Sequence, residues 1–564
     1  MFLRESRQKL ADGTTISHYQ LAESVWDKTK KRARTRIVYN FGRTDDPRVV
    51  ERLKQLARSI LRRCSPEEIV ADDPGWKVID AWPYGHVHVL EHLWRKLGIA
   101  EIVANQAIGT KLEFDVERAL FAMVANRTIA PCSKLYCQEQ WLREDIKIEG
   151  TRELDLQHLY RGMDFLEANK EQIEQEIFFR VSDLFNLDVD LVFYDTTSLH
   201  FEVDEEDHGW GEDDTIRGSE QSGSKQYKAP RKRGYPKNGR WDVPQIVVGL
   251  AVTRDGIPVR HWVFPGNTVD VTTVEQVKKD LSGWKLTRCV FVGDAGMVSE
   301  DNLKKLSLGG GKYIVCMPIV KGGEVAKDVL TRRGRYQKVA QNLRVKEVVV
   351  GDGERRRRYA VCHNPEEEAR QRKHRQQVLE ELEAELASLS DCVSGDQHNK
   401  RACALRASGR YGKYLRMLKN GQLKIDKGAI KRASKYDGKF VVHSNDDTLN
   451  AEDMALGYKQ LMRVEQAWRD LKSVLRMRPV YHWAPHRIHA HVALTFLSLL
   501  LQRVAETACE DTWRNIRDDL KQIKLVQLSG PNGDLWQVTE PRPAARNRLK
   551  PLKIPAPPLV IEHA

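Results

Sequence analysis

The sequence predicts a mixed α/β protein in which a sheet flanked by helices is interrupted by an insertion and preceded by a mainly helical region. Three observations carry this prediction. Apolar runs of strand length alternate with helical periodicity between residues 190 and 318. Charged residues dominate residues 321–437, after which the apolar run 439–445 resumes the earlier pattern. Residues 50–185 repeat apolar side chains at helical spacing.

These changes of pattern divide the chain into segments. At 564 residues the chain is longer than one hydrophobic core supports, so several modules are expected. The Pro-rich end, PRPAARNRLKPLKIPAPPL, predicts an extended or loosely docked tail. The predicted segments are an N-terminal region (1–185), the first part of the core (186–320), an insertion (321–437), the second part of the core (438–506) and a C-terminal tail (507–564).

The net charge favours a polyanionic partner. The chain has 92 Lys and Arg against 79 Asp and Glu, a formal charge of +13. Cations clustered on one face gain free energy by displacing the counterions condensed along a phosphate backbone. The charge therefore predicts a nucleic-acid partner, with a basic surface that binds nothing specific as the alternative.

Cysteine usage and hydropathy predict a soluble protein of the cytoplasm. The 9 cysteines are scattered without a Cys-x-x-Cys pair, which argues against a zinc finger and a disulfide framework. The first residues, MFLRESRQKLADG, lack the apolar core of a signal peptide. The apolar run 492–501 is about half the length that crosses a bilayer, so it predicts a buried helix and no contact with a membrane.

A hairpin and several helices are expected before residue 190. Residues 16–26 and 35–42 read as two strands on either side of a basic turn. The lysines and arginines of that turn either contact phosphates or form a solvated tip. The helical periods that follow could include a helix-turn-helix, although no recognition helix stands out.

Strands and helices are predicted in a fixed order between residues 190 and 318. Asp195 lies in the first strand and Asp294 ends the fourth, each beside small residues that leave room for a ligand. An aspartate at such a place is more often a turn former or a helix cap. The predicted elements are strands at 190–203, 246–252 and 259–266, a helix over VDVTTVEQVKKDL, a strand at 288–296, a helix over SEDNLKKLSL with Ser299 as N-cap, and a strand at 312–318.

Residues 458–476 predict one amphipathic helix that carries a reactive carboxylate at its edge. At about 100° per residue, Tyr458, Glu465 and Lys472 fall within about 20° of one another. A solvated face of mixed charge is the alternative interpretation. A separate apolar stripe, suited to docking on a sheet, consists of Leu461, Val464, Trp468, Leu471 and Leu475.

Three carboxylates from separate segments, Asp195, Asp294 and Glu465, are the candidate catalytic and metal-ligating residues. An oxygen-only set of ligands suits Mg²⁺ or Mn²⁺. Histidines that could bind a softer metal are close in sequence further along the chain. They are interpreted as helix-entry and core residues, and they are His482, His486, His489 and His491.

The segments VFYDTTSL, VFVGDAG and YKQLMRVEQAWRDLKSVLRMRPVYHW resemble the three catalytic blocks of bacterial insertion-sequence transposases of the DDE class. The group with the signature Tyr, two residues, Arg, three residues, Glu, six residues, Lys is the most similar. Tyr458, Glu465 and Lys472 match that spacing, whereas Leu461 occupies the arginine position. Arg463 is turned about 160° from Glu465, so Arg469, one turn beyond it, is the better physical substitute.

The resemblance spans roughly residues 190–500 and implies an RNase H-like core interrupted by an insertion. It implies a transposase that binds the terminal inverted repeats of its element and performs strand cleavage and strand transfer as a homodimer on double-stranded DNA, in the bacterial nucleoid. Asp195, Asp294 and Glu465 would hold two Mg²⁺ ions, with Mn²⁺ as a substitute. The expected DNA contacts are Tyr458, Arg469, Lys472, Arg476, Arg463, Lys237 and Arg240.

In members of this family the insertion supplies an aromatic residue that stacks on a flipped base when a DNA hairpin forms. The present chain has no Trp between Trp284 and Trp468. A tyrosine such as Tyr336 or Tyr359 would have to take that place.

Other functions remain open from the sequence. A nuclease or junction resolvase on the same fold would use the same acids without joining DNA ends. A regulator derived from a transposase would bind DNA without cleaving it, which the presence of all three acids argues against. An unrelated binding module would leave the three matching segments unexplained.

Overall fold

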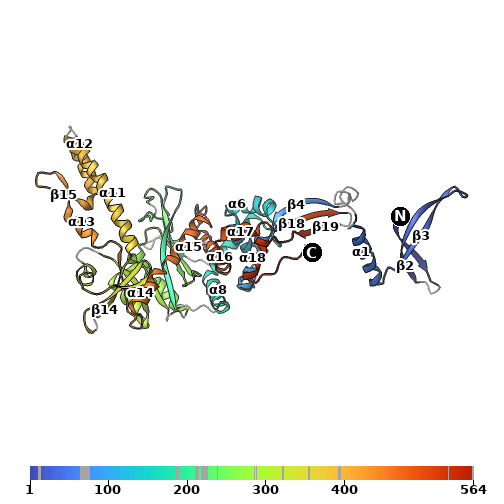
Figure 1. Cartoon of the computed structure of the whole chain (residues 1–564), viewed down its shortest axis with the longest axis horizontal. Helices are drawn as coiled ribbons and strands as arrows, with labels where there is room; N and C mark the ends of the chain where they lie inside the picture. The colour runs from blue at the N-terminus through green and yellow to red at the C-terminus, as the bar shows by residue number, and fades with distance from the viewer. Residues whose placement is uncertain are drawn as a thin grey trace. The chain divides into compact units, whose positions relative to one another are not determined.

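The structure is a computed structural model, and it describes residues 1–10, 14–61, 63, 76–185, 190–209, 215–217, 226–237, 239–284, 286, 289–319, 323–353, 356–390, 395–530 and 533–561. The chain forms two compact units, whose elements are labelled in Figure 1. The first unit comprises Met1–Ala81, Val526–Val538 and Leu559–Ala564, and the second comprises Trp82–Leu525 and Thr539–Pro558.

The first unit begins with an antiparallel sheet in the order β1-β2-β3, followed by helix α1. The predicted hairpin is present as β2 and β3. The prediction of a mainly helical N-terminal region is wrong at its start, because β1 precedes the hairpin as an edge strand. Most β1 side chains are exposed, so the strand lacks the apolar alternation that would reveal it. The bounds are β1 (Phe2–Lys9), β2 (Thr15–Asp27), β3 (Arg32–Arg43) and α1 (Pro47–Leu61).

A second sheet, in the order β20-β19-β18-β4, includes the strands β18, β19 and β20 from the region beyond residue 520. The predicted extended tail is therefore wrong: it contains strands, and a helix that buries Ala545, Leu549 and Leu552. The Pro-rich composition was misleading because the first proline of the helix, Pro543, stands in its first turn, where a missing N–H costs little. The elements are β4 (Lys77–Pro83), β18 (Lys524–Gly530), β19 (Gly533–Val538), α18 (Pro543–Leu552) and β20 (Val560–Ile561).

The second unit contains a group of helices around α16 (Pro485–Cys509), which packs against α5 and α7. Helix α16 is long and apolar enough to cross a membrane, but 72% of its apolar window is buried inside the protein. This burial agrees with the prediction of a core helix over the same residues. The other helices of the group are α3 (Gly85–Lys96), α4 (Ile99–Ala107), α5 (Val116–Ile129), α6 (Lys134–Tyr136), α7 (Leu156–Ala168), α8 (Lys170–Leu184) and α17 (Trp513–Leu520).

The central sheet of the second unit has nine strands in the order β12-β13-β14-β17-β11-β10-β5-β8-β9. Strand β10 pairs in parallel with both β5 and β11, and the other neighbouring strands are antiparallel. The strands are β5 (Leu191–His200), β8 (Gln245–Val252), β9 (Pro258–Pro265), β10 (Val290–Gly293), β11 (Lys312–Met317), β12 (Gln337–Ala340), β13 (Leu343–Val350), β14 (Arg357–His363) and β17 (Lys439–Ser444), and a separate ladder joins β6 (Thr215–Arg217) to β7 (Gln226–Lys228).

Helices cover both faces of the central strands. On one face, Tyr194 of β5 belongs to a hydrophobic core with Val274 of α9 (Asp270–Gly283) and Leu303 of α10 (Glu300–Ser307). Ser299 caps α10 as predicted, because its hydroxyl accepts a hydrogen bond from the Asn302 backbone N–H. Side chains alternate along a strand, so Asp195 lies on the opposite face.

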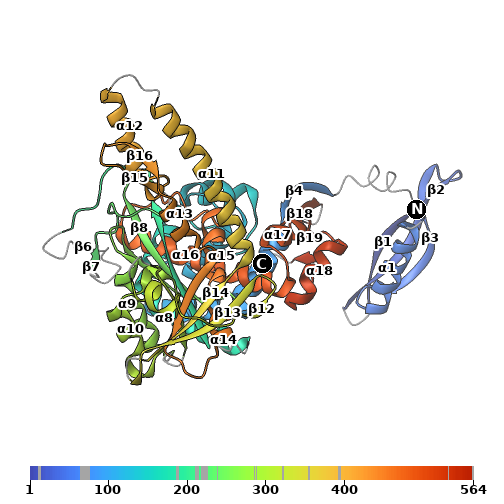
Figure 2. The same cartoon turned by 60° about the vertical axis from the view of Figure 1, so that its left-hand side comes forward.

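Strands β12, β13 and β14 belong to the central sheet, although they lie in the predicted insertion 321–437. Strand β14 pairs with β17 along its whole length, so the sheet continues past the predicted boundary. Only the helical segment between β14 and β17 leaves the sheet, and Figure 2 shows its helices α11 and α12 extending away from the strands. Its elements are α11 (Pro365–Ser390), α12 (Gly395–Ala407), β15 (Leu415–Met417), β16 (Leu423–Ile425) and α13 (Lys427–Ser434).

The predicted single helix over residues 458–476 is wrong. The chain forms α14 (Ala451–Lys459) and α15 (Met462–Ser473), separated by a turn at residues 460–461 where backbone hydrogen bonds join residues three apart. Beyond α15, Arg476 has a φ of 44°, which ends helical geometry. The predicted apolar stripe is confirmed, since Leu461, Val464, Trp468, Leu471 and Leu475 are all buried.

Candidate active site

Asp195 and Asp294 come together on adjacent parallel strands. Val292 of β10 is paired with Phe193 of β5, so two residues further along Asp294 falls beside Asp195 on the same face of the sheet. Burial, joined by the negative charges of Asp294 and Asp270, raises the pKa of the Asp195 carboxyl to about 6, although the Lys237 charge and a hydrogen bond with the Thr196 backbone oppose the rise. The site therefore holds carboxylates whose negative charge is only partly compensated by the protein.

The site lies where the pairing between β10 and β5 stops. Strand β10 ends at Gly293, whereas β5 continues to His200. The chain segment around Lys237 lines this part of β5, because its backbone N–H donates to the Ser198 hydroxyl at 3.0 Å. The Lys237 ammonium donates to the carbonyl oxygen of Thr196 at 2.7 Å. The Thr196 carbonyl oxygen, beyond the end of the pairing with β10, thus accepts a hydrogen bond that holds the Lys237 ammonium near Asp195.

Lys237 contacts two aspartates of the site, Asp195 and Asp270. Its Nζ lies 3.9 Å from Asp195 Oδ1 and 3.0 Å from Asp270 Oδ2. Asp270, the first residue of α9, also accepts a hydrogen bond from the Thr196 hydroxyl. Sequence reasoning missed Asp270, because an acid in the first turn of a helix is commonplace. The one available signal was its position directly after the third core strand.

Tyr458 connects helix α14 to the second aspartate. Its hydroxyl donates to Asp294 Oδ1 at 2.9 Å. Burial raises the pKa of the Tyr458 hydroxyl, and the neighbouring Cys316 and Asp294 raise it further, so the group stays a neutral donor. Gly457 allows the close approach of this helix, since a Cβ there would lie 3.0 Å from Ile314 Cδ1 of β11.

Lys472 connects helix α15 to the first acid's strand. Its ammonium donates to the hydroxyl of Thr197, which lies two residues from Asp195 and so on the same face of β5. Burial, followed by the charges of Arg478 and Lys237, lowers the pKa of Lys472 to about 8, although the Asp195 charge opposes this. Lys472 is therefore a desolvated cation beside the acids.

Glu465 lies seven residues from both Tyr458 and Lys472, on the helix that packs against β5, and its side chain is exposed. Among the described residues, none gives its carboxylate a hydrogen bond or an ion pair. Within the same part of the chain, no three His, Cys, Asp or Glu residues lie close enough to hold a metal ion. The structure thus brings together two of the three predicted acids and places the third on the flanking helix.

The chemistry of Asp195 and Asp294 fits a hard divalent cation. Both supply carboxylate oxygens, which Mg²⁺ and Mn²⁺ prefer. Asp195 is partly buried beside Asp294, and its Oδ1 lies 3.9 Å from the Lys237 ammonium, so a cation placed beside both carboxylates would balance their charge further.

The predicted DNA contacts divide into two groups. Tyr458, Lys472 and Lys237 contact the acids or their strand, whereas the arginines do not. Arg240 is held by Asp242, with its Nε 2.8 Å from Asp242 Oδ1, and by Glu202.

The remaining arginines are exposed. Arg469 donates to the Gln466 side chain at 2.5 Å, one turn before it on the same helix. Arg463 lies beside the turn between β8 and β9, where a Cβ on Gly256 would be 4.0 Å from Arg463 Cβ. Arg476 accepts a hydrogen bond at its carbonyl oxygen from Arg127 Nη1 at 3.0 Å.

The two tyrosines considered for base stacking differ in exposure. Tyr359 is fully buried in the sheet, and its hydroxyl donates to Glu324, so its ring is not presented for stacking. Tyr336 packs against the same hydrophobic cluster but is only partly buried.

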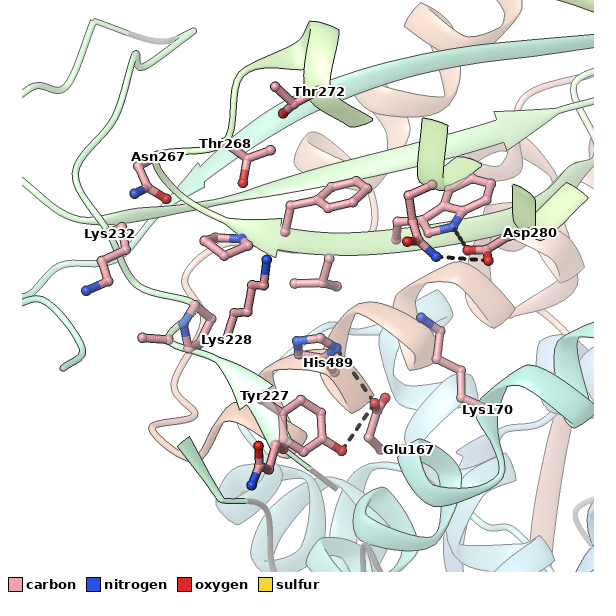
Figure 3. A pocket seen from close by; sticks show the side chains of 18 of the residues that line it. Glu167, Lys170, Tyr227, Lys228, Lys232, Asn267, Thr268, Thr272, Asp280 and His489 are labelled. Atoms are coloured by element: carbon pink, nitrogen blue, oxygen red, sulfur yellow. Dashed lines mark hydrogen bonds and ion pairs between the residues drawn. The ribbon is translucent and has the colours of Figure 1, made fainter. Parts of the chain in front are cut away.

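A cavity of about 760 Å³ lies elsewhere on the second unit, between β9, α9 and the start of α16 (Figure 3). Acids and bases lie beside one another in its lining, with Arg260 Nη2 3.5 Å from Asp280 Oδ2 and His489 Nδ1 3.6 Å from Glu167 Oε1. Asp280 accepts a hydrogen bond from Trp262 Nε1 at 2.8 Å, and Glu167 accepts one from the Tyr227 hydroxyl at 3.4 Å. None of the three predicted acids lines this cavity.

Comparisons with known proteins identify the family. Residues 213–501, slightly more than half of the chain, match the family described as "Transposase DDE domain", and residues 3–72 match "IS1634 family transposase, N-terminal domain". Asp294 and Glu465 lie inside the first match, and Asp195 precedes it.

One solved structure, a piggyBac transposase synaptic complex with hairpin DNA, is similar at 9% identity and a TM-score of 0.32, covering 78% of this chain and 79% of that one. No curated protein matches. The family matches establish that the chain belongs to the DDE transposases of insertion sequences, with an IS1634-type N-terminal domain, a family of phosphoryl-transfer enzymes.

Proposed function

We propose that the protein is the DNA transposase of its own element, binding the terminal inverted repeats and catalysing metal-dependent strand cleavage followed by strand transfer. The observation that carries this proposal is the placement of Asp195 beside Asp294 at neighbouring parallel strands, with Tyr458 hydrogen-bonded to Asp294 and Lys472 hydrogen-bonded to Thr197 of the first strand. Electrostatic positioning of a phosphate at such a site is the main requirement of phosphoryl transfer.

The strand arrangement supports an RNase H-like core. The five strands β9-β8-β5-β10-β11 place the first acid on the central strand and the second on its parallel neighbour. Helix α15, which carries Glu465, packs against the same central strand. This is the arrangement that the sequence resemblance implies.

The residues that would hold Mg²⁺ or Mn²⁺, two ions per site, are Asp195 and Asp294, joined by Glu465. When bound, such ions lower the pKa of a nucleophilic hydroxyl and stabilise the leaving oxygen. The protein's own contribution is orientation: the Tyr458 hydroxyl fixes one carboxylate, and Lys237 balances part of the charge on the other.

The basic residues around the site would hold the DNA strand. Lys472 offers a cation within the site, and the exposed arginines offer contacts at its margin. The contacts proposed at the margin are Arg463, Arg469, Arg476 and Arg240. Cutting two ends of one element requires two sites, so we propose a homodimer assembled on DNA in the cytoplasm, at the nucleoid.

The test is incubation of the full chain with Mg²⁺ and DNA that carries both ends of the element, scored for nicked, hairpin and joined products. Joined products that disappear in Asp294→Asn support the transposase. Nicks without any joined product would favour a nuclease on the same fold. Binding without nicks would favour a regulator that lacks catalysis.

A further inference from the structure

A second cavity, of about 360 Å³, lies in the second unit next to the C-terminal end of α15. Its wall comes from α5, the residues around α6, α7 and the segment that leads into α16. Tyr481 and Leu135 at its rim are 63% and 46% exposed, so the cavity opens to solvent. We call it the cationic pocket, and its lining residues are Arg127, Cys132, Ser133, Lys134, Leu135, Tyr160, Tyr481, His482 and His491.

The cationic pocket buries basic groups without a carboxylate in its lining, and hydrogen bonding with Cys137 lowers the pKa of its Cys132 thiol to about 7. Arg127, Lys134 and His491 are 5%, 4% and 2% exposed. Asp164, a carboxylate whose charge acts on the pocket, is already held by Arg487, with the Arg487 Nε 2.9 Å from Asp164 Oδ1. No carboxylate of the lining therefore neutralises the positive charge of the pocket.

Donors in the pocket lack acceptors. Arg127 Nη1 donates to the Arg476 carbonyl oxygen at 3.0 Å, but the buried Arg127 Nε has no partner in the described part of the chain. His491 Nε2 donates to the Met477 carbonyl oxygen at 3.0 Å, so its buried Nδ1, which has no partner in the described part of the chain, is an acceptor and is not counted among these donors. No described residue accepts a hydrogen bond from the Lys134 ammonium. Buried donors and charges left in this state are costly unless a ligand satisfies them.

Electrostatics within the pocket agree with this geometry. Burial, followed by the charge of Arg127, lowers the pKa of Lys134 to about 7 against the opposing effect of the Cys137 and Cys132 thiols. Burial, followed by the charges of Lys134, Arg487 and Arg127, lowers the pKa of His482 to about 3. Each cation thus makes the next one harder to charge, and an anion would reverse that effect.

The chemistry of the pocket selects the class of ligand. A metal ion is disfavoured by the surrounding positive charge, and no three His, Cys, Asp or Glu residues anywhere in the described ranges lie close enough to hold one. The cavity in Figure 3 differs, because carboxylates line it beside bases, with Arg260 3.5 Å from Asp280 and His489 3.6 Å from Glu167. A compact oxyanion that accepts several hydrogen bonds fits the cationic pocket.

We propose that the cationic pocket binds a phosphate group, supplied by the backbone of the DNA strand that occupies the neighbouring active site. The segment after α15 links the two places: Arg478 Nη1 lies 3.3 Å from His200 Nδ1 at the end of β5, and His482 lines the pocket. The DNA source of the phosphate rests on the proposed function, whereas the affinity for a phosphate group does not.

The first arm of the test uses inorganic phosphate and thermal unfolding of the full chain. Phosphate is expected to raise the Tm of the wild type more than that of Lys134→Met, because the variant lacks the buried cation. Lys279→Met, a change at an exposed lysine of α9, serves as the matched control and accounts for general stabilisation by the salt. An equal phosphate-dependent rise of Tm in Lys134→Met and the control overturns the proposal.

A second variant guards against misfolding. Leu135→Glu places a negative charge at the exposed rim without burying it, and it is expected to weaken the phosphate-dependent rise of Tm as well. A full rise of Tm in Leu135→Glu contradicts the assigned location of the phosphate.

The second arm identifies the source of the phosphate, with sheared duplex DNA of mixed sequence as the probe. Loss of one backbone contact is expected to reduce the slope of log affinity against log salt by about one in Lys134→Met. An unchanged slope together with a lost phosphate effect would assign the pocket to free phosphate and overturn the DNA source. Asp195→Asn should keep both effects, so failure of the catalytic proposal is separable from failure of this one.

Discussion

The active site and the cationic pocket bury charge of opposite sign, and in neither does the protein fully neutralise it. Asp195 has a raised pKa, and Lys134 has a lowered one. Elsewhere the same unit buries charge in satisfied pairs, as where Arg231 Nε donates to Asp207 Oδ1 at 2.9 Å. The difference separates buried charge that stabilises the fold from buried charge that is kept for a ligand.

The largest effect is expected for the acids themselves. Asp195→Asn, Asp294→Asn and Glu465→Gln should each lower Mg²⁺-dependent cleavage by more than about a thousandfold, because each removes a proposed ligand worth several kcal/mol of transition-state stabilisation. Gel assays of nicking measure the loss, and filter binding should show DNA affinity nearly unchanged. Asp301→Asn, at an exposed position in α10, is the control. Wild-type cleavage by any of the three would remove that residue from the site.

The free energy of unfolding should distinguish Asp207, which is paired with Arg231, from Asp195, whose charge is only partly balanced. Asp207→Asn breaks a buried ion pair and should lower the free energy of unfolding by about 3–5 kcal/mol. Asp195→Asn relieves a poorly balanced charge and should raise the free energy of unfolding in metal-free buffer by about 1–3 kcal/mol. Chemical denaturation measures both changes. A destabilised Asp195→Asn would mean that the structure already compensates this carboxylate.

Removal of the Tyr458 hydroxyl should have an intermediate effect. Tyr458→Phe loses the hydrogen bond to Asp294 while keeping the ring in place, so cleavage should fall by about tenfold, the value of one hydrogen bond to a charged group. Single-turnover rates at saturating Mg²⁺ measure this loss. Rates equal to the wild type would show that Asp294 is oriented without the tyrosine.

Lys472 should make DNA binding depend on pH. Because its pKa is lowered to about 8, the ammonium is charged below that pH and neutral above it, so affinity should fall several-fold as the pH rises through about 8. Lys472→Arg remains charged and should lose this dependence. Fluorescence anisotropy with labelled duplex DNA measures both affinities. The same pH dependence in Lys472→Arg would place the titrating group elsewhere.

The smallest difference is expected between two exposed arginines of α15. Arg469→Ala should weaken cleavage a few-fold more than Arg463→Ala, because Arg469 is one turn from Glu465 while Arg463 lies beside the turn at Gly256. Relative cleavage rates of the two variants decide the matter. The reverse order would show that the DNA approaches α15 from the side of Arg463.

The elements that the sequence revealed are those with a strong burial pattern. Strand β8 is buried along its whole length, so it appears as an uninterrupted apolar run, and α15 shows its apolar stripe at helical spacing. The edge strand β1 has no such pattern because its side chains are exposed. The turn at 460–461 was hidden because the stripe continues across it.

The site was only partly readable from the sequence for a related reason. Asp195 and Asp294 end or interrupt apolar runs, which makes them conspicuous, whereas Asp270 looks like an ordinary helix-start acid. The cationic pocket forms because residues near 130 lie close to residues near 485. Neither segment has a sequence pattern that predicts this contact. Such long-range proximity is a property of the fold.

The pairing of His363 with Lys439 means that the helical segment between β14 and β17 can change in length without disturbing the sheet. The chain departs from the ladder and re-enters it at facing positions, so the intervening stretch is a loop whose two ends already meet. Shortening it, lengthening it or exchanging it for another domain would alter neither strand order nor register, and would add little closure entropy. Transposases with this arrangement can therefore differ in the domain inserted between β14 and β17 while their catalytic sheet stays the same.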